Sequence, residues 1–202
     1  MLDESDQLAV IRGLQDGCRD AWARLYDGYS VDVWRYVARL LGPDAASVAD
    51  VVQETFIEAA QSARKFDPAR GRLWSWLVGI AHHRASAHWR RVHGVKALHD
   101  RLKSDLGSRT EAATDNVASS QRLQQVELAE SVRATLAELS SDYSALLLAK
   151  YSDNRELADL SREWSSSTEA IKSKLARARR EFRAKFGQPA ASATSIASEK
   201  KK

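Results

Sequence analysis

The stretch Asp50-Val51-Val52-Gln53-Glu54-Thr55-Phe56 carries the pattern that decides the fold. Read as a helix over about residues 45–64, it places side chains at the i, i+3, i+4 spacing of one buried stripe. That stripe contains Val48, Val51, Val52, Thr55, Phe56 and Ala59. The other side carries Asp50, Gln53, Glu54, Ile57 and Glu58. An acidic surface with one exposed isoleucine suits docking onto a basic protein, although an ordinary solvated face is the commoner origin of such carboxylates.

A turn and a second helix follow this segment. Pro68 fixes its own φ and disfavours helical geometry at Asp67, while Gly71 permits a left-handed exit. The first helix is therefore expected to end near Lys65 and the next to begin near Arg72. The apolar stripe of the second helix contains Leu73, Trp76, Leu77, Ile80 and Ala81. Its exposed side is predicted to carry Gly79, His82, His83, Ser86 and Arg90, with Trp74 near the loop, and is a candidate nucleic-acid surface.

Charge separates these two parts of the chain. Residues 1–63 contain five Lys and Arg against eleven Asp and Glu, a formal balance of −6. Residues 64–91 contain seven Lys and Arg against one Asp, a balance of +6. The whole-chain charge of +4 hides this dipole. Such a distribution is expected when one surface binds protein and another binds phosphate.

Composition favours an all-α protein of two small helical domains. The chain has 202 residues, 44% of them hydrophobic, and only three prolines and nine glycines. Cys18 is the single cysteine, which excludes an intramolecular disulfide and a multi-cysteine zinc site. The N-terminal residues are acidic, and no apolar run approaches membrane-spanning length. We therefore expect no membrane insertion and a cytoplasmic location.

Helical periodicity also sets the domain boundaries. Two helices between Leu8 and Leu41, closed by Gly42-Pro43, join the next two in a domain of residues 1–92. Residues 93–121 lack a sustained apolar face and are predicted to be a flexible linker. Periodicity returns in residues 122–186, a second domain. The small polar tail of residues 187–202 is predicted to be disordered.

The end of the second domain has the outline of a helix-turn-helix. Asn154 to Trp164 reads as a short helix, Ser165-Ser166-Ser167 as a turn with Ser167 as N-cap, and Thr168 to Phe186 as a long helix. The predicted core side of the long helix contains Ala170, Ile171, Leu175, Ala178 and Phe182. A helical hairpin with a solvated basic face fits the pattern equally well.

If this helix enters a DNA groove, its N-terminal end would read bases and its later cations would contact phosphate. The predicted base-reading residues are Ser167, Thr168, Glu169, Lys172 and Ser173. The predicted cationic contacts are Lys174, Arg177, Arg179 and Arg180.

Neither a metal site nor an active site is predicted. His83 and His88 are near helical spacing, but no cysteine or suitably placed carboxylate completes a ligand set. The sequence also offers no nucleophile paired with a base. We therefore expect neither a cofactor nor an enzymatic activity.

Taken together, five strings resemble the extracytoplasmic-function sigma factors of the sigma-70 family. They are DVVQETF, FDPARG, RLWSWLVGIA, LAELSSDYSALLLAKY and REWSSSTEAIKSKLARARREFR. The resemblance covers about residues 8–92 and 122–186, which would correspond to sigma regions 2 and 4. It implies a factor that binds core RNA polymerase and directs promoter-specific transcription initiation. The resemblance leaves open whether an anti-sigma protein is a further partner.

The resemblance also implies roles for the two domains. The face with Asp50, Gln53 and Glu54, together with Ile57 and Glu58, would dock on the polymerase. The loop would capture a flipped base of the minus-ten element of promoter DNA, and the helix after it would hold the opened single strand. The residues predicted for these contacts are Arg64, Lys65, Arg70, Arg72, Trp74, His82, His83, Ser86 and Arg90. The helix-turn-helix would read the minus-thirty-five element as duplex.

The chain departs from the family pattern at three places. The family commonly has asparagine at the position of His83 and aspartate at that of Ala87, and a glycine with an aliphatic residue replaces Ser165-Ser166. Two alternative functions are kept. One is a sigma-like regulator that binds polymerase or an anti-sigma protein without supporting initiation, and the other is an ordinary helix-turn-helix repressor.

Overall fold

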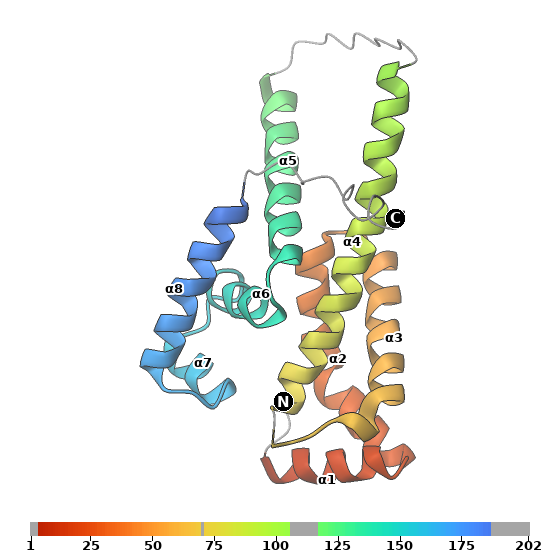
Figure 1. The fold of residues 1–202 in the computed structure, drawn as a ribbon, viewed down its shortest axis with the longest axis vertical. Coiled ribbons are helices and arrows are strands. Elements are labelled where there is room, and N and C mark those ends of the chain that lie inside the picture. The colour runs from red at the N-terminus through yellow and green to blue at the C-terminus, as the bar shows by residue number, and fades with distance from the viewer. Residues whose placement is uncertain (1–3, 70, 106–116, 187–202) are drawn as a thin grey trace, which may run out of the picture.

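The computed structural model describes residues 4–69, 71–105 and 117–186, and within these ranges it contains helices and loops but no strand (Figure 1). The prediction of an all-α fold is thus confirmed. None of the helices in the described ranges is long and apolar enough to cross a membrane.

The first helical unit consists of α1 (Glu4–Gln15), α2 (Arg19–Leu41), α3 (Ala45–Ser62), the 3-10 turn η1 (Ala63–Lys65) and α4 (Leu73–Asp105). The helices α2, α3 and α4 lie side by side, and α1 lies across one end of them (Figure 1). Their facing stripes are fully buried, as at Leu25, Val33, Val48 and Leu77. Burying each of these side chains contributes about 1.5 to 3 kcal/mol relative to exposure.

Helix ends in this unit follow the predicted signals. Gly42 ends α2 in a left-handed conformation, with φ of 93°. Asp44 then caps α3 by accepting a hydrogen bond from the backbone N–H of Ala46 (3.2 Å). Ser47 donates its hydroxyl to the same carboxylate (2.6 Å), which holds the pKa of Asp44 below its usual value. The turn through Pro68 separates η1 from α4, as predicted.

The second helical unit consists of α5 (Val117–Glu138), α6 (Ser141–Leu147), the π-helical turn η2 (Leu148–Ser152), α7 (Leu157–Glu163) and α8 (Thr168–Lys185). The predicted cap Ser167 accepts a hydrogen bond from the backbone N–H of Ala170 (3.1 Å) and starts α8. Leu160 of α7 packs with the buried stripe of α8, which contains Ile171, Leu175 and Ala178. The sequence pattern thus correctly located the helix-turn-helix outline.

One predicted core residue of α8 is exposed. Ala170 lies on the surface, whereas its neighbour Ile171 is buried. Successive residues of an α-helix are rotated by about 100°, so Ala170 falls outside the stripe that faces α7. Its inclusion in the core was wrong.

The predicted linker differs from the structure at both of its ends. Helix α4 continues past residue 92 to Asp105, and α5 begins at Val117. Gly94 is the only glycine or proline in the sequence between Val92 and Asp105, and a single glycine costs a helix only about 1 kcal/mol. Residues 106–116 of the predicted linker and the predicted disordered tail of residues 187–202 lie outside the described residues.

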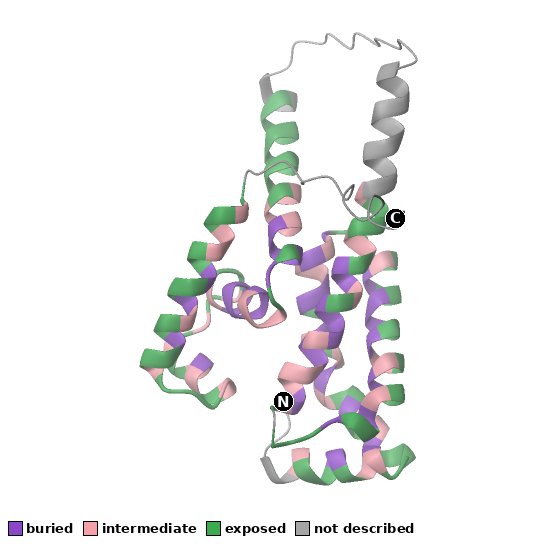
Figure 2. Ribbon diagram, in the orientation of Figure 1, coloured by how far each residue is buried: buried purple, intermediate pink, exposed green. Residues whose placement is uncertain are grey.

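The two units pack against each other. Helices α5 and α6 contact α2 and α4, and the buried residues of both units form one continuous cluster. Leu136 of α5, Leu139 just after that helix and Leu146 of α6 belong to it together with Val37 of α2. Figure 2 shows this band of buried residues between the units, while the outer side of α8 is largely exposed.

Candidate nucleic-acid and protein interfaces

The acidic face of α3 is open to solvent. Asp50, Gln53 and Glu54 are exposed, and the side chain of Ile57 is 49% exposed. On the opposite side of the helix Val51 is buried against the core. The predicted arrangement of the two faces is therefore present. We call Asp50, Gln53, Glu54 and Ile57 the acidic surface.

Glu58 is held differently from these residues. It is half-buried, and its carboxylate accepts a hydrogen bond from Nε of Arg84 on α4. The Nη1 atom of Arg84 lies 3.9 Å from the carboxylate of Glu54. Glu58 therefore joins α3 to α4, and the structure gives it a contact within the fold that periodicity alone does not indicate.

The loop between η1 and α4 is anchored by its apolar residue. Phe66 is buried and packs on Trp76, with ring centroids 5.0 Å apart. The carbonyl of Phe66 accepts a hydrogen bond from the side-chain amide of Gln15 (3.0 Å). This anchoring leaves the predicted DNA contacts Arg64 and Lys65 exposed. The predicted contact Arg70 lies outside the described residues.

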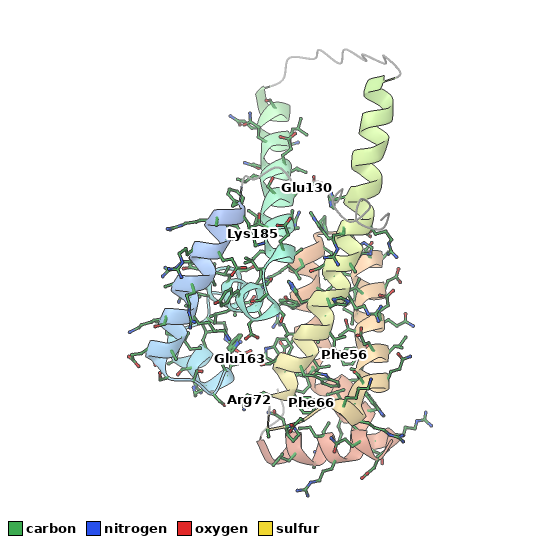
Figure 3. All side chains as sticks on the ribbon, viewed as in Figure 1. Phe56, Phe66, Arg72, Glu130, Glu163 and Lys185 are labelled. Atoms are coloured by element: carbon green, nitrogen blue, oxygen red, sulfur yellow. The ribbon has the colours of Figure 1, made fainter. Side chains whose placement is uncertain are left out.

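Arg72, at the start of α4, is bound to the second unit. Its Nη1 atom donates hydrogen bonds to the carbonyl oxygens of Arg162 (2.8 Å) and Glu163 (2.9 Å) at the end of α7. Such terminal carbonyls lack a partner within their own helix. Figure 3 shows Arg72 and Glu163 near each other, where the two units meet.

Trp74 is also turned inward. It is half-buried and stacks on Tyr29 of α2, with ring centroids 6.1 Å apart and an interplanar angle of 12°. Burial raises the pKa of Tyr29 to about 12. The indole Nε1 of Trp74 is buried and meets no acceptor in the described part of the chain. The ring that was predicted to stack on a flipped base therefore lies against protein.

His82 and Ser86, predicted from periodicity to lie on the exposed side of α4, are only 8% and 4% exposed. The hydroxyl of Ser86 donates to the carbonyl of Ala137 (2.8 Å). Nε2 of His82 lies 2.9 Å from the carbonyl of Leu139, and Nδ1 lies 2.8 Å from the hydroxyl of Tyr36. The predicted exposure was wrong because α5 and α6 cover this face of α4.

These contacts fix the tautomer of His82. A carbonyl oxygen only accepts hydrogen bonds, so Nε2 carries the proton and Nδ1 accepts from Tyr36. Burial lowers the pKa of His82, and the hydrogen bond to Leu139 opposes this shift in part. The neutral ring therefore links α2, α4 and the end of α5. Of the other predicted residues on this helix, His83 and Arg90 remain exposed.

The outer face of α8 is open and basic. Most of its predicted DNA contacts are exposed, namely Ser167, Glu169, Lys172, Ser173, Arg177, Arg179 and Arg180. Two predicted contacts are half-buried, Thr168 and Lys174. Lys174 lies 2.6 Å from the carboxylate of Asp142 on α6, so its charge is used within the unit. Arg179 also donates to the hydroxyl of Tyr151 (3.3 Å).

A polar cavity of about 300 Å³ lies where α2 and the start of α4 face η2 and α7. Its charged lining comes from both units and comprises Asp32, Arg35, Arg39, Asp153, Arg155 and Glu163. Arg39 forms an ion pair with Asp153 across the interface, and Arg155 lies 3.1 Å from Glu163. Burial raises the pKa of Glu163, whose side chain is only 7% exposed. Sequence periodicity gave no signal for this cluster, because its members are far apart in the chain.

In the described ranges no group of three or more His, Cys, Asp or Glu side chains is placed to hold a metal ion.

Comparison with known proteins gives consistent similarities. The family model Sigma-70 region 2 matches residues 25–94. The ECF RNA polymerase sigma factor SigL of Mycobacterium tuberculosis is 31% identical over 156 residues, which cover 75% of this chain and 80% of SigL. The ECF RNA polymerase sigma factor SigK of Mycobacterium ulcerans is 34% identical over 117 residues, covering 57% of this chain and 60% of SigK. The match to SigL is longer than residues 1–105, so it includes part of the second unit.

Among solved structures, one match extends over most of this chain. The structure of CnrH in complex with the cytosolic domain of CnrY matches with a TM-score of 0.45 and 19% sequence identity. The match covers 89% of this chain and 96% of that chain.

Proposed function

The chain belongs to the extracytoplasmic-function RNA polymerase sigma factors of the sigma-70 family, and on this premise we propose which of its surfaces bind polymerase and which bind promoter DNA. It is a factor that directs transcription initiation, not an enzyme. We propose that the first unit docks on core polymerase and holds the opened minus-ten strand. The second unit reads the minus-thirty-five element as duplex.

The observation that carries this proposal is the pair of oppositely charged open surfaces on separate units. The acidic surface lies on α3, and the basic outer face lies on α8. A carboxylate surface around one exposed isoleucine supports docking on a basic protein partner. A capped helix with outward cations supports insertion into the major groove, where its first turn would meet base edges.

The strand-reading role rests on the start of α4 and the loop before it. Arg64 and Lys65 offer exposed cations in that loop, and His83 and Arg90 offer exposed groups further along α4. Trp74 would add to this site only by turning away from Tyr29, and stacking of an unstacked base on its ring would then be worth about 1 to 3 kcal/mol. Ser86 and His82 were expected from the sequence to contact DNA. We propose that they instead hold the two units together through their hydrogen bonds to backbone carbonyls.

Transcription from a defined set of promoters tests the proposal. Purified chain is mixed with core polymerase and a library of bacterial promoter fragments, and run-off transcripts are sequenced. We expect transcripts that start at a shared subset of promoters. Stable binding to core without any specific transcript would overturn the proposal and favour the sigma-like regulator. Tight, sequence-specific DNA binding without polymerase would instead favour the repressor.

The docking role has its own test in a charge reversal on the acidic surface. Asp50→Lys combined with Glu54→Lys should weaken binding to core polymerase at least tenfold, because both side chains are exposed and lie off the buried stripe. The matched control is Asp16→Lys with Asp27→Lys, which reverses two exposed charges elsewhere on the first unit. Affinity is measured by fluorescence anisotropy, and circular dichroism reports the fold. Equal affinities of the folded test and control variants would refute docking through α3.

A further inference from the structure

Arg84 of α4 lies at the border of the acidic surface of α3. Its Nε atom donates to the carboxylate of Glu58, and its Nη1 atom lies 3.9 Å from the carboxylate of Glu54. The two glutamates are one helical turn apart on α3, whereas Arg84 comes from the helix that begins after the Pro68 turn. A single guanidinium from α4 therefore lies beside two successive turns of α3.

The carboxylates of α3 form one row. Asp50, Glu54 and Glu58 are spaced at i, i+4 and i+8, so successive members are neighbours on the helix surface. Like charges at this spacing repel each other and destabilise the helix slightly. The cation of Arg84 at one end of the row offsets this repulsion, and a planar guanidinium can face two carboxylates at once.

The row of carboxylates also turns around α3. Four residues of a helix rotate by about 400°, so each carboxylate is rotated by about 40° from the one before it. The row therefore approaches α4 at its last member. Consistent with this, the side chain of Glu58 is 31% exposed and that of Glu54 is 51% exposed. A protein that binds α3 would meet Asp50 and Glu54, with Arg84 bordering Glu54.

We propose that Arg84 is a positioning residue for polymerase docking, which acts through Glu54. By holding Glu58 against α4 and bordering Glu54, its guanidinium sets the direction of the Glu54 carboxylate before the partner binds. The acidic surface is then ordered in the free chain, so less side-chain freedom is lost on binding. This proposal rests on the proposed function, because it concerns the same docking surface. In this role Arg84 itself makes no contact with the polymerase.

Charge and positioning predict opposite outcomes for Arg84→Gln. The substitution removes a cation from the edge of an acidic surface, so attraction to a basic partner alone would increase affinity. Loss of positioning instead frees the carboxylates of Glu54 and Glu58, and ordering them on binding then reduces affinity. We expect binding to core polymerase to weaken roughly fivefold, with most of the change in the dissociation rate.

Biolayer interferometry of the full chain on immobilised core polymerase measures both rates. Promoter DNA is left out, so that strand binding by α4 does not contribute. The matched control is Arg24→Gln, which removes the cation from an ion pair between α2 and α1 of the same unit. The control should leave the dissociation rate unchanged. Parental or tighter affinity of Arg84→Gln would overturn the proposal.

A double-mutant cycle tests whether Arg84 acts through Glu54. Glu54→Gln removes the carboxylate that Arg84 is proposed to direct, so adding Arg84→Gln to it should change affinity by less than about twofold. Arg84→Lys keeps the charge but not the planar fork, and its affinity should lie between those of the parent and Arg84→Gln. An equal loss from Arg84→Gln with and without Glu54 would contradict the proposal, since Arg84 would then act elsewhere.

Folding is checked separately from binding, because Arg84 joins α3 to α4. Circular dichroism and urea denaturation accompany every variant. If Arg84→Gln does not fold, Arg84→Lys takes its place in the cycle. Weaker binding of the lysine variant that disappears in the Glu54→Gln background supports the proposal, and unchanged binding overturns it.

Docking and positioning fail in different ways. If Asp50→Lys with Glu54→Lys binds core polymerase as well as its control does, docking through α3 is refuted and Arg84 has no role in it. If that charge reversal weakens binding while Arg84→Gln does not, docking stands and the positioning role is overturned.

Discussion

The helices α4 and α8 invite comparison, because both carry predicted DNA contacts beside a regular apolar stripe. In α8 the stripe packs on α6 and α7, and the opposite face stays open with Lys172, Arg177 and Arg180 exposed. In α4 the stripe packs on α2 and α3, but α5 and α6 cover part of the opposite face. Helical periodicity describes the two helices equally well, yet only one of them keeps its second face in solvent.

The difference shows what an amphipathic pattern can report. It identifies the face that is buried by neighbouring helices, which both sequences encode with strong apolar residues. It does not report whether a second unit covers the remaining face through polar contacts. His82 and Ser86 lie on a face that is covered in this way. Each makes a hydrogen bond to a backbone carbonyl, and such a bond leaves no hydrophobic pattern in the sequence.

The largest expected effect tests the open face of α8. Arg177→Ala with Arg180→Ala removes two exposed cations, and each phosphate contact changes the slope of log K against log salt by about 0.9. Duplex affinity of the free chain should fall roughly fiftyfold at about 0.1 M salt, equally for unrelated sequences. Anisotropy titrations over a salt series measure both quantities.

The control for this prediction removes two exposed arginines from the first unit. Arg12→Ala with Arg19→Ala makes the same change in net charge away from α8. We expect only a small loss of duplex affinity and an unchanged salt slope. Matching losses in the two double variants would mean that total charge, not the face of α8, governs binding.

The next effect tests the covered face of α4. Ser86→Ala leaves the buried carbonyl of Ala137 without its donor, so the free energy of unfolding should decrease by about 1 to 2 kcal/mol. The adjacent exposed residue offers a control, since Ala87→Ser should change stability by less than about 0.5 kcal/mol. Urea denaturation of the full chain measures both values. A Ser86 variant as stable as the parent would show that the hydrogen bond to Ala137 does not stabilise the covered face of α4.

Local signals predicted most of the fold. The breaks at Gly42-Pro43 and Pro68 and the cap at Ser167 depend on neighbouring residues alone, and each lies where the sequence indicated. The predicted linker begins too early, because Gly94, Gly107 and a polar composition conceal the continuation of α4 to Asp105. Four of the five residues predicted on the acidic face of α3 are exposed, and the fifth, Glu58, is half-buried because it contacts Arg84, a residue distant in the sequence.

The interface between the units could not be predicted from the sequence. Its charged members, such as Arg39, Asp153 and Glu163, look like ordinary surface residues when the chain is read linearly. Their pairing depends on how the two helical units meet in space. The spacing of apolar residues therefore does not predict polar contacts of this kind between units.

The smallest expected effect concerns the protonation of His82 in the covered face. Tyr36 of α2 faces its Nδ1, the carbonyl of Leu139 faces its Nε2, and His83 and Arg90 of α4 add nearby positive charge. Burial raises the pKa of Tyr36, and the negative charge of Asp142 on α6 raises it further. The net result is a pKa of His82 below the value of about 6.5 expected in the unfolded chain.

Because the unfolded chain binds this proton more readily, the contribution of His82 to stability is present above about pH 6.5 and is lost as pH falls toward its lowered pKa. The contribution of Glu163 to stability depends on pH in the opposite direction. Because the pKa of Glu163 is raised, its contribution is lost as pH rises through that value. We therefore compare the parent with His82→Gln, which keeps Glu163 constant and isolates the histidine. The stability difference should decrease between about pH 7.5 and pH 5.5, by no more than about 1.4 kcal/mol per pH unit. A difference that is independent of pH would show that the ring is not held neutral between Tyr36 of α2 and the carbonyl of Leu139 that follows α5.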